Sequence, residues 1–153
     1  MGHALKATIL LISFSVIAPA GHACLCQLVP PEEVFENADV VMSAKPFHYR
    51  TTGERFDRKR LTTFLVTKVW KGDVSGEVVI EHGDRDGFCG IDFETGEEVV
   101  VFASLNRNGV LSTGLCSQLS TRDLSPERLL ELKSSAELEQ RSRQVIRLVP
   151  VGD

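Results

Sequence analysis

The four cysteines constrain the fold of this chain more than any other feature. Two of them form a Cys-x-Cys pair, Cys24 and Cys26, and the other two, Cys89 and Cys116, stand alone. An even number of cysteines in an exported chain indicates two disulfides, for which three pairings exist. A Cys24–Cys26 bridge would close a small, strained ring, so we expect this pair to be tied to Cys89 and Cys116 in one of two orders. A four-cysteine zinc site is an alternative, although the single cysteines lack the paired spacing of a zinc knuckle.

Residues 1–23 have the pattern of a secretory signal peptide. Lys6 gives a positive start, residues 7–17 are apolar, and Gly21 and Ala23 place small side chains at the minus-three and minus-one positions of a cut before Cys24. The apolar stretch is too short to span a membrane. We therefore expect a secreted protein, extracellular or periplasmic, with a single domain over residues 24–153.

Two other processing events fit the same region. Ala18-Pro19-Ala20 also has the small-x-small pattern, and a cut there would leave Gly21-His22-Ala23 in front of the cysteine. A lipid on Cys24 is a further alternative, although that signal usually has a leucine-like residue where Gly21 stands. The cut before Cys24 would leave a free cysteine amine at the start of the mature chain.

The net charge argues against two classes of partner. The formal net charge is −4, and removal of residues 1–23 would take away Lys6 and no acidic residue, which gives −5. Nucleic-acid-binding domains present a basic face, and electrostatic attachment to membranes uses clusters of basic residues. We therefore expect neither a nucleic-acid partner nor electrostatic attachment to a membrane.

The rest of the chain predicts an all-β fold with peripheral helices. The segment 61–70 is the clearest strand, because β-branched and aromatic residues alternate there with apolar side chains on both faces. Asn106-Arg107-Asn108-Gly109 is typical of a hairpin turn. Five short antiparallel strands joined by turns indicate a small closed barrel. Strands are predicted over 39–49, 61–70, 77–82, 97–104 and 110–116, and helices over 30–37 and from Ser125 onward.

Two further segments lie outside these elements. Residues 50–60 are polar and are predicted to be an exposed loop. The basic cluster of this loop is either a solvated surface or a patch for a partner; it consists of Arg55, Arg58, Lys59 and Arg60. The apolar tail 145–151 is expected to pack back on the barrel.

Several short motifs of the mature chain follow one another in an order that is known from one protein family. They are Cys24-Leu25-Cys26, Ala38-Asp39-Val40-Val41, Thr67-Lys68-Val69-Trp70-Lys71-Gly72, Phe88-Cys89-Gly90, Gly109-Val110-Leu111 and Cys116-Ser117. In this order the chain resembles the N-terminal inhibitory domain of the tissue inhibitors of metalloproteinases. That domain is a netrin-like module with an OB-fold barrel, so the resemblance implies this fold over nearly all of the mature chain.

The resemblance also implies one disulfide pairing, Cys24 with Cys89 and Cys26 with Cys116. The chain departs from the family at a third disulfide, whose positions correspond to Glu36 and Asp153 in this chain. The resemblance covers the family's N-terminal domain, so functions of its C-terminal domain are not expected here.

The function implied by the resemblance is inhibition of a zinc metalloprotease. The α-amine and carbonyl oxygen of Cys24 would chelate the catalytic zinc in place of its water. Leu25 would enter the pocket beside the zinc; family members usually have a small hydroxyl residue there, so Leu25 suggests a deeper apolar pocket or weaker inhibition. The zinc belongs to the protease, and no cofactor is expected in this chain itself. The contact ridge would consist of Cys24, Leu25, Cys26, Gln27, Leu28, Gly87 and Phe88.

Three other functions have some support in the sequence or can be argued against from it. Catalysis would need a nucleophile and a base, but His48 and His82 are the only mature histidines and lie in strands, so we do not expect an enzyme. A calcium loop is partly suggested by acidic residues without the spacing of that motif, namely Asp84, Asp86, Asp92 and Glu94. The strongest rival is a non-inhibitory netrin-like module that binds a protein or glycan through its barrel face.

Overall fold

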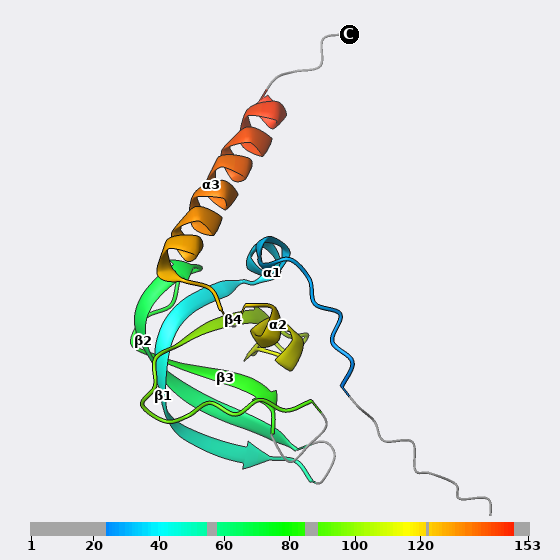
Figure 1. Ribbon diagram of the computed structural model, residues 1–153, viewed down its shortest axis with the longest axis vertical. Coiled ribbons are helices and arrows are strands. Elements are labelled where there is room, and N and C mark those ends of the chain that lie inside the picture. Colours follow the sequence, from blue (N-terminus) through cyan, green and yellow to red (C-terminus); the bar gives the residue numbers. More distant parts are fainter. Residues whose placement is uncertain (1–23, 55–57, 85–88, 122, 149–153) are drawn as a thin grey trace, which may run out of the picture.

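Figure 1 shows a five-stranded sheet closed into a ring, with helices at its edges. The computed structural model describes residues 24–54, 58–84, 89–121 and 123–148. Within these ranges, no helix is long and apolar enough to cross a membrane. The elements are α1 (Pro31–Asn37), β1 (Val40–Thr52), β2 (Lys59–Lys71), β3 (Glu77–Gly83), β4 (Val99–Leu105), β5 (Leu111–Ser112), α2 (Leu115–Ser120) and α3 (Pro126–Leu148).

The ring is closed by one parallel contact. The strand order is β1-β2-β3-β5-β4, and every neighbouring pair is antiparallel except β3 and β5. Glu81 pairs with Ser112 there, and the Thr113 amide donates to the Glu81 carbonyl at 3.0 Å. The expectation of antiparallel strands throughout is therefore wrong for this pair. Five strands cannot alternate in direction around a closed ring, so at least one pair must be parallel.

The long strand β1 contributes to two separate cores. Val40, Met42 and Ala44 belong to a cluster with Phe64 and side chains of β3 and β4. Val41 belongs instead to a cluster with the helices and Trp70. Successive residues of a strand point to opposite faces, so one strand can support both clusters. Trp70 is 4% exposed, which confirms that it is a core residue.

The two predicted helices are confirmed, and both pack against the ring. Proline stands in the first turn of α1 with Glu32 and Glu33, where its missing N–H costs no hydrogen bond. Ser125 caps α3, because its hydroxyl oxygen accepts the Arg128 amide at 3.2 Å. Leu129 and Leu132 of α3 are buried in the cluster that contains Phe35 and Trp70.

The far half of α3 departs from the prediction. The helix continues to Leu148 and points away from the ring (Figure 1). The expected return of the tail onto the barrel is therefore wrong for residues 145–148, and residues 149–151 lie outside the described part of the chain. Helix propensity explains the continuation, since residues 126–144 contain neither glycine nor a second proline.

Three predicted boundaries also change. Residues 50–52 and 59–60 extend β1 and β2, because the ladder continues as far as the pair Thr52 and Lys59. The strand β4 begins at Val99, two residues later than expected. Cys116 lies in α2 and not in a strand, because β5 ends at Ser112 and Gly114 starts a helical turn by accepting the Gln118 amide.

Candidate functional site

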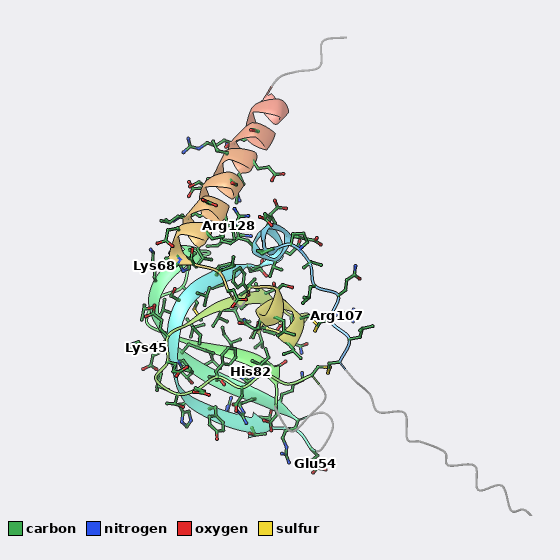
Figure 2. All side chains as sticks on the ribbon, viewed as in Figure 1. Lys45, Glu54, Lys68, His82, Arg107 and Arg128 are labelled. Carbon is green, nitrogen blue, oxygen red and sulfur yellow. A yellow bond between two sulfur atoms is a disulfide. The ribbon has the colours of Figure 1, made fainter. Side chains whose placement is uncertain are left out.

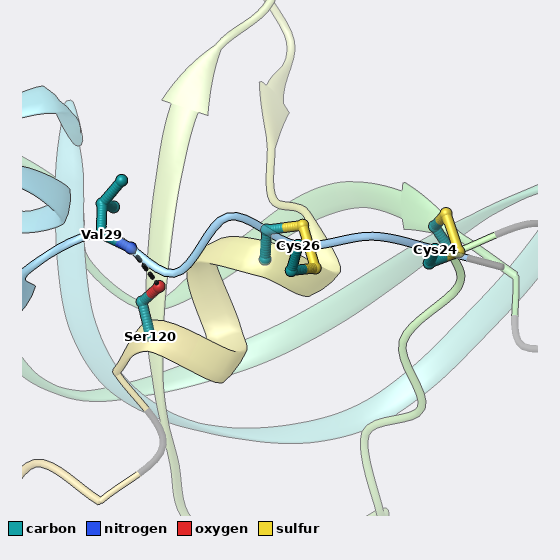
Figure 3. Close-up of a disulfide and its surroundings, with 6 residues drawn as sticks. Cys24, Cys26, Val29 and Ser120 are labelled. Atoms are coloured by element: carbon teal, nitrogen blue, oxygen red, sulfur yellow. Dashed lines mark hydrogen bonds between the residues drawn. A yellow bond between two sulfur atoms is a disulfide. The ribbon is translucent and has the colours of Figure 1, made fainter.

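The N-terminal segment, residues 24–29, is fastened to the fold at three points (Figure 3). Disulfides join Cys24 to Cys89 and Cys26 to Cys116, with Cα atoms 5.4 and 5.2 Å apart. The Val29 amide donates to the Ser120 hydroxyl at 3.4 Å. This disulfide pairing is the one that the resemblance implied. Every second or third residue of the segment is held, so its backbone has little conformational freedom.

The side chains between these anchors face solvent. Leu25 is 96% exposed and Leu28 is 64% exposed, and Cys24 and Gln27 are also exposed. An apolar side chain that touches so little of its own protein is available to a partner. Residues 24–28 of the predicted contact ridge therefore form one exposed strip, within which Cys26 is half-buried, whereas Gly87 and Phe88 lie outside the described residues.

The partner cysteine of Cys24 is held against the end of β3. The Ile91 amide donates to the Gly83 carbonyl at 3.1 Å. A Cβ atom on Gly83 would lie 3.2 Å from the Gly90 Cα atom and 3.4 Å from the Cys89 carbonyl oxygen. Cys89 itself has a φ of +59°, a left-handed conformation that non-glycine residues rarely adopt. Close packing of backbone on backbone therefore fixes Cys89 and, through the disulfide, Cys24.

An arginine links the two ends of this connector, residues 83–92. Arg60 Nη2 lies 2.7 Å from Asp84 Oδ1, and Arg60 Nη1 lies 2.6 Å from Asp92 Oδ1. Arg58 also approaches Asp84, at 3.7 Å. The guanidinium of Arg60 stacks on the Tyr49 ring, 4.4 Å from its centroid. The Asp84 side chain is only 3% exposed, so its charge depends on these arginines.

A buried histidine completes the same region. His82, on β3 (Figure 2), is 3% exposed, and its Nδ1 lies 2.9 Å from the Gly83 carbonyl oxygen. A carbonyl only accepts, so Nδ1 carries the proton and Nε2 accepts the Thr62 hydroxyl, with Thr62 Oγ1 and Nε2 2.8 Å apart. The Phe93 ring packs against the imidazole in a T-shaped contact, with ring centroids 5.1 Å apart.

The pKa of His82 is lowered from its ordinary value. Burial is the main cause, since it disfavours the charged imidazolium, and the positive charge of Arg60 acts in the same direction. The hydrogen bond to Gly83 and the carboxylates of Asp84 and Asp92 raise the pKa and offset only part of this effect. His82 is therefore held neutral near neutral pH.

This arrangement was not predicted from the sequence. Arg58 and Arg60 were expected in an exposed loop, whereas the Arg60 side chain is 14% exposed and both arginines pair with Asp84. Lys59 pairs outside the ring with Glu81, at 2.9 Å, and Arg55 lies outside the described residues. The available signal was alternation, because Arg60 shares a strand face with the buried residues Thr62 and Phe64.

The acidic residues proposed for calcium are used differently. Asp84 and Asp92 are engaged by Arg60, and Glu94 is an exposed residue between β3 and β4. Asp86 is among the residues that the structure does not describe. In the described ranges, three or more His, Cys, Asp or Glu side chains do not gather in a group suited to a metal ion. The two mature histidines do not form a common site, since His48 is exposed on β1 and His82 is buried on β3.

No protein-family model matches this chain, and no curated protein matches it by sequence. The geometry of the N-terminal segment and of the connector therefore has to support any functional inference. Both features converge on Cys24, which the connector holds through Cys89.

Proposed function

We propose that this protein is a secreted inhibitor of zinc metalloproteases, and that residues 24–153 are a netrin-like domain with an OB-fold barrel. One observation carries the proposal: residues 24–28 form an exposed strip whose backbone is fixed by the disulfides of Cys24 and Cys26. The ordered motifs shared with the tissue inhibitors of metalloproteinases support the same reading. Removal of residues 1–23 would make Cys24 the first residue.

The chemistry of inhibition resides in the backbone atoms of Cys24. A catalytic zinc has three protein ligands and one open position, which water occupies. The neutral α-amine and the carbonyl oxygen of Cys24 form a five-membered chelate with such a zinc and displace the water. An α-amine has a reference pKa of about 7.7–8.0, so deprotonation costs little near neutral pH. The zinc is the protease's own, and this chain supplies two ligands to it.

Rigidity makes this chelator effective. A free peptide terminus would lose conformational entropy when it binds, at about 0.5–1.5 kcal/mol per immobilised side chain in addition to the backbone cost. The bridges at Cys24 and Cys26 impose that order before binding. Leu25 lies between them and is 96% exposed, so it enters the pocket beside the zinc without unpacking from its own protein.

The test uses the whole chain, expressed with its leader in a host that exports it. N-terminal sequencing and intact mass first establish whether the recovered protein begins at an unmodified Cys24. Inhibition is then measured against the isolated catalytic domain of a zinc endopeptidase with a fluorogenic peptide substrate. The matched control is the same protein extended by one alanine before Cys24, which removes the free amine and leaves both disulfides.

Inhibition by the native terminus and its loss in the extended form would support the proposal. Equal inhibition by both forms would exclude chelation by Cys24. A lack of inhibition across a panel of zinc endopeptidases, with Cys24 free and both disulfides formed, would exclude the proposed function.

A second candidate, binding of a protein through the outer face of the ring, is favoured by a different observation. Phe47 on β1, Leu65 on β2 and Val79 on β3 are 46%, 48% and 47% exposed. Exposed apolar residues that gather on neighbouring strands are typical of contact surfaces. Such binding would survive the one-residue extension, which separates the two candidates.

A further inference from the structure

We propose that Arg60 and His82 are positioning residues that clamp the connector, hold Cys24 in place through Cys89, and release it when His82 is protonated in acid. The consequence for inhibition rests on the function proposed above, whereas the clamp itself does not. The name clamp is used below for Arg60, His82, Asp84 and Asp92 together with the Gly83 carbonyl.

The first part of the clamp is electrostatic. A single guanidinium, that of Arg60, binds Asp84 at the start of the connector and Asp92 at its end, at 2.7 and 2.6 Å. Cys89 lies between these two aspartates in the sequence. Charge-assisted hydrogen bonds of this length are about twice as strong as neutral ones. Because Asp84 is buried, salt and water screen its interaction with Arg60 only a little. The two ends of the connector are therefore held at one point.

The second part of the clamp is the Gly83 carbonyl, which accepts two hydrogen bonds. One comes from the Ile91 amide at 3.1 Å and the other from His82 Nδ1 at 2.9 Å. The first fixes the chain two residues after Cys89, and the second fixes the carbonyl itself. His82 is in turn held by the Thr62 hydroxyl on β2. The histidine thus connects the barrel wall to the backbone that carries Cys89.

Charged groups face His82 from two sides. Arg60 comes from β2, and Asp84 and Asp92 come from the connector. Arg58, just before β2, also approaches Asp84. Both carboxylates are already neutralised by arginine, so a proton on the imidazole would create an additional buried cation beside Arg60. The neighbouring pair of Lys59 and Glu81 is neutral as a whole.

Protonation therefore requires access to water. An imidazolium that is 3% exposed gains hydration only if the end of β3 separates from the connector. The lowered pKa of His82 expresses the same cost. Separation would free the backbone around Gly83 and Gly90, and Cys89 would lose its fixed conformation. The N-terminal segment would then keep its chemistry but lose its fixed geometry.

The experiment compares the two disulfides in one molecule, recovered after export from cells that express the full chain. A water-soluble phosphine reduces the protein for short times, and the thiols are trapped and assigned by mass spectrometry. The ratio of the reduction rate of Cys24–Cys89 to that of Cys26–Cys116 cancels the pH dependence of the reagent. We expect this ratio to rise about fivefold between about pH 7.5 and about pH 5.

Three variants assign the effect. His82→Gln removes the titratable group, so the ratio should no longer depend on pH. His48→Gln makes the same change at an exposed histidine on β1 and should behave as the native protein. Thr62→Val removes the hydroxyl bonded to Nε2 and with it the link from His82 to β2, so the pH at which the ratio rises should shift from that of the native protein. This third variant keeps the test available if His82→Gln does not fold.

A ratio that stays constant with pH in the native protein would overturn the proposal, as would an unchanged rise in His82→Gln. The readout involves no protease. A pH-dependent ratio without inhibition of any protease would leave the clamp intact and refute the proposed function. Inhibition of a protease together with a ratio that does not change with pH would support the proposed function and refute the clamp.

Discussion

Asp84 Oδ1 lies 2.7 Å from Arg60 Nη2, in a pair whose side chains are 3% and 14% exposed. A buried carboxylate and a nearly buried guanidinium lose most of their hydration, so each depends on the other. Replacement of one partner leaves the remaining charge without compensation. We therefore expect Asp84→Asn to lower the free energy of unfolding by about 2–4 kcal/mol, measured by urea denaturation.

The matched control is Asp92→Asn. Asp92 binds the same arginine, but its side chain is 40% exposed, so water compensates for much of the loss. We expect this variant to cost less than about 1 kcal/mol. Equal losses in the two variants would mean that burial does not distinguish the two ion pairs.

The sequence predicted the elements of the fold better than their connections. Alternation on β2 and the serine before α3 depend on local chemistry, and both predictions are confirmed. The parallel contact between Glu81 and Ser112 could not be found in this way. It follows from closure of an odd number of strands, a property of the whole ring that no short segment contains.

Of the candidate site, the N-terminal segment was predicted from the sequence and the ion pairs of the connector were not. The cysteine pair and the exposed leucines follow from the motif and the pattern of the leader, and the structure places residues 24–28 in one strip. Arg60 pairs with Asp84 and Asp92, which lie 24 and 32 positions further along the chain. Such long-range pairing of charges has no local signature in the sequence.

Stability should fall in mild acid because of His82. An unfolded histidine has a pKa near the reference value of 6.5, and the folded value is lower. Below about pH 6.5 the unfolded state therefore binds more protons, and the free energy of unfolding decreases as the pH falls towards the folded pKa. The stability that the protein gains from neutral His82 is fully present at pH values above the pKa of the unfolded histidine.

Urea denaturation at about pH 7.5, 6.5 and 5.5 measures this dependence. His82→Gln should flatten it over this range, and His48→Gln should leave it unchanged. A native protein whose stability is constant over the range would show that protonated His82 is accommodated without cost.

Gly72 should be difficult to replace. Its φ is +86°, and a Cβ atom there would lie 2.5 Å from the Asp39 carbonyl oxygen, so both the conformation and the space require glycine. We expect Gly72→Ala to cost about 2–4 kcal/mol in the free energy of unfolding. Gly76 in the same turn has a φ of +65° with no atom within 4 Å of such a Cβ, so Gly76→Ala should cost only about 1 kcal/mol. Similar losses of stability in Gly72→Ala and Gly76→Ala would show that the backbone at Asp39 moves away from the new Cβ atom at little cost.

A substitution of Leu25 should affect inhibition without affecting stability. Its side chain is 96% exposed, so Leu25→Asp should change the free energy of unfolding by less than about 0.5 kcal/mol. In an apolar protease pocket the same carboxylate would be desolvated without a partner, so we expect inhibition to weaken at least about tenfold, or 1.4 kcal/mol. Leu138→Asp is the matched control, since Leu138 is 65% exposed on α3, far along the chain from Cys24. Equal inhibition by Leu25→Asp and the native protein would remove Leu25 from the contact and favour binding through the ring's outer face.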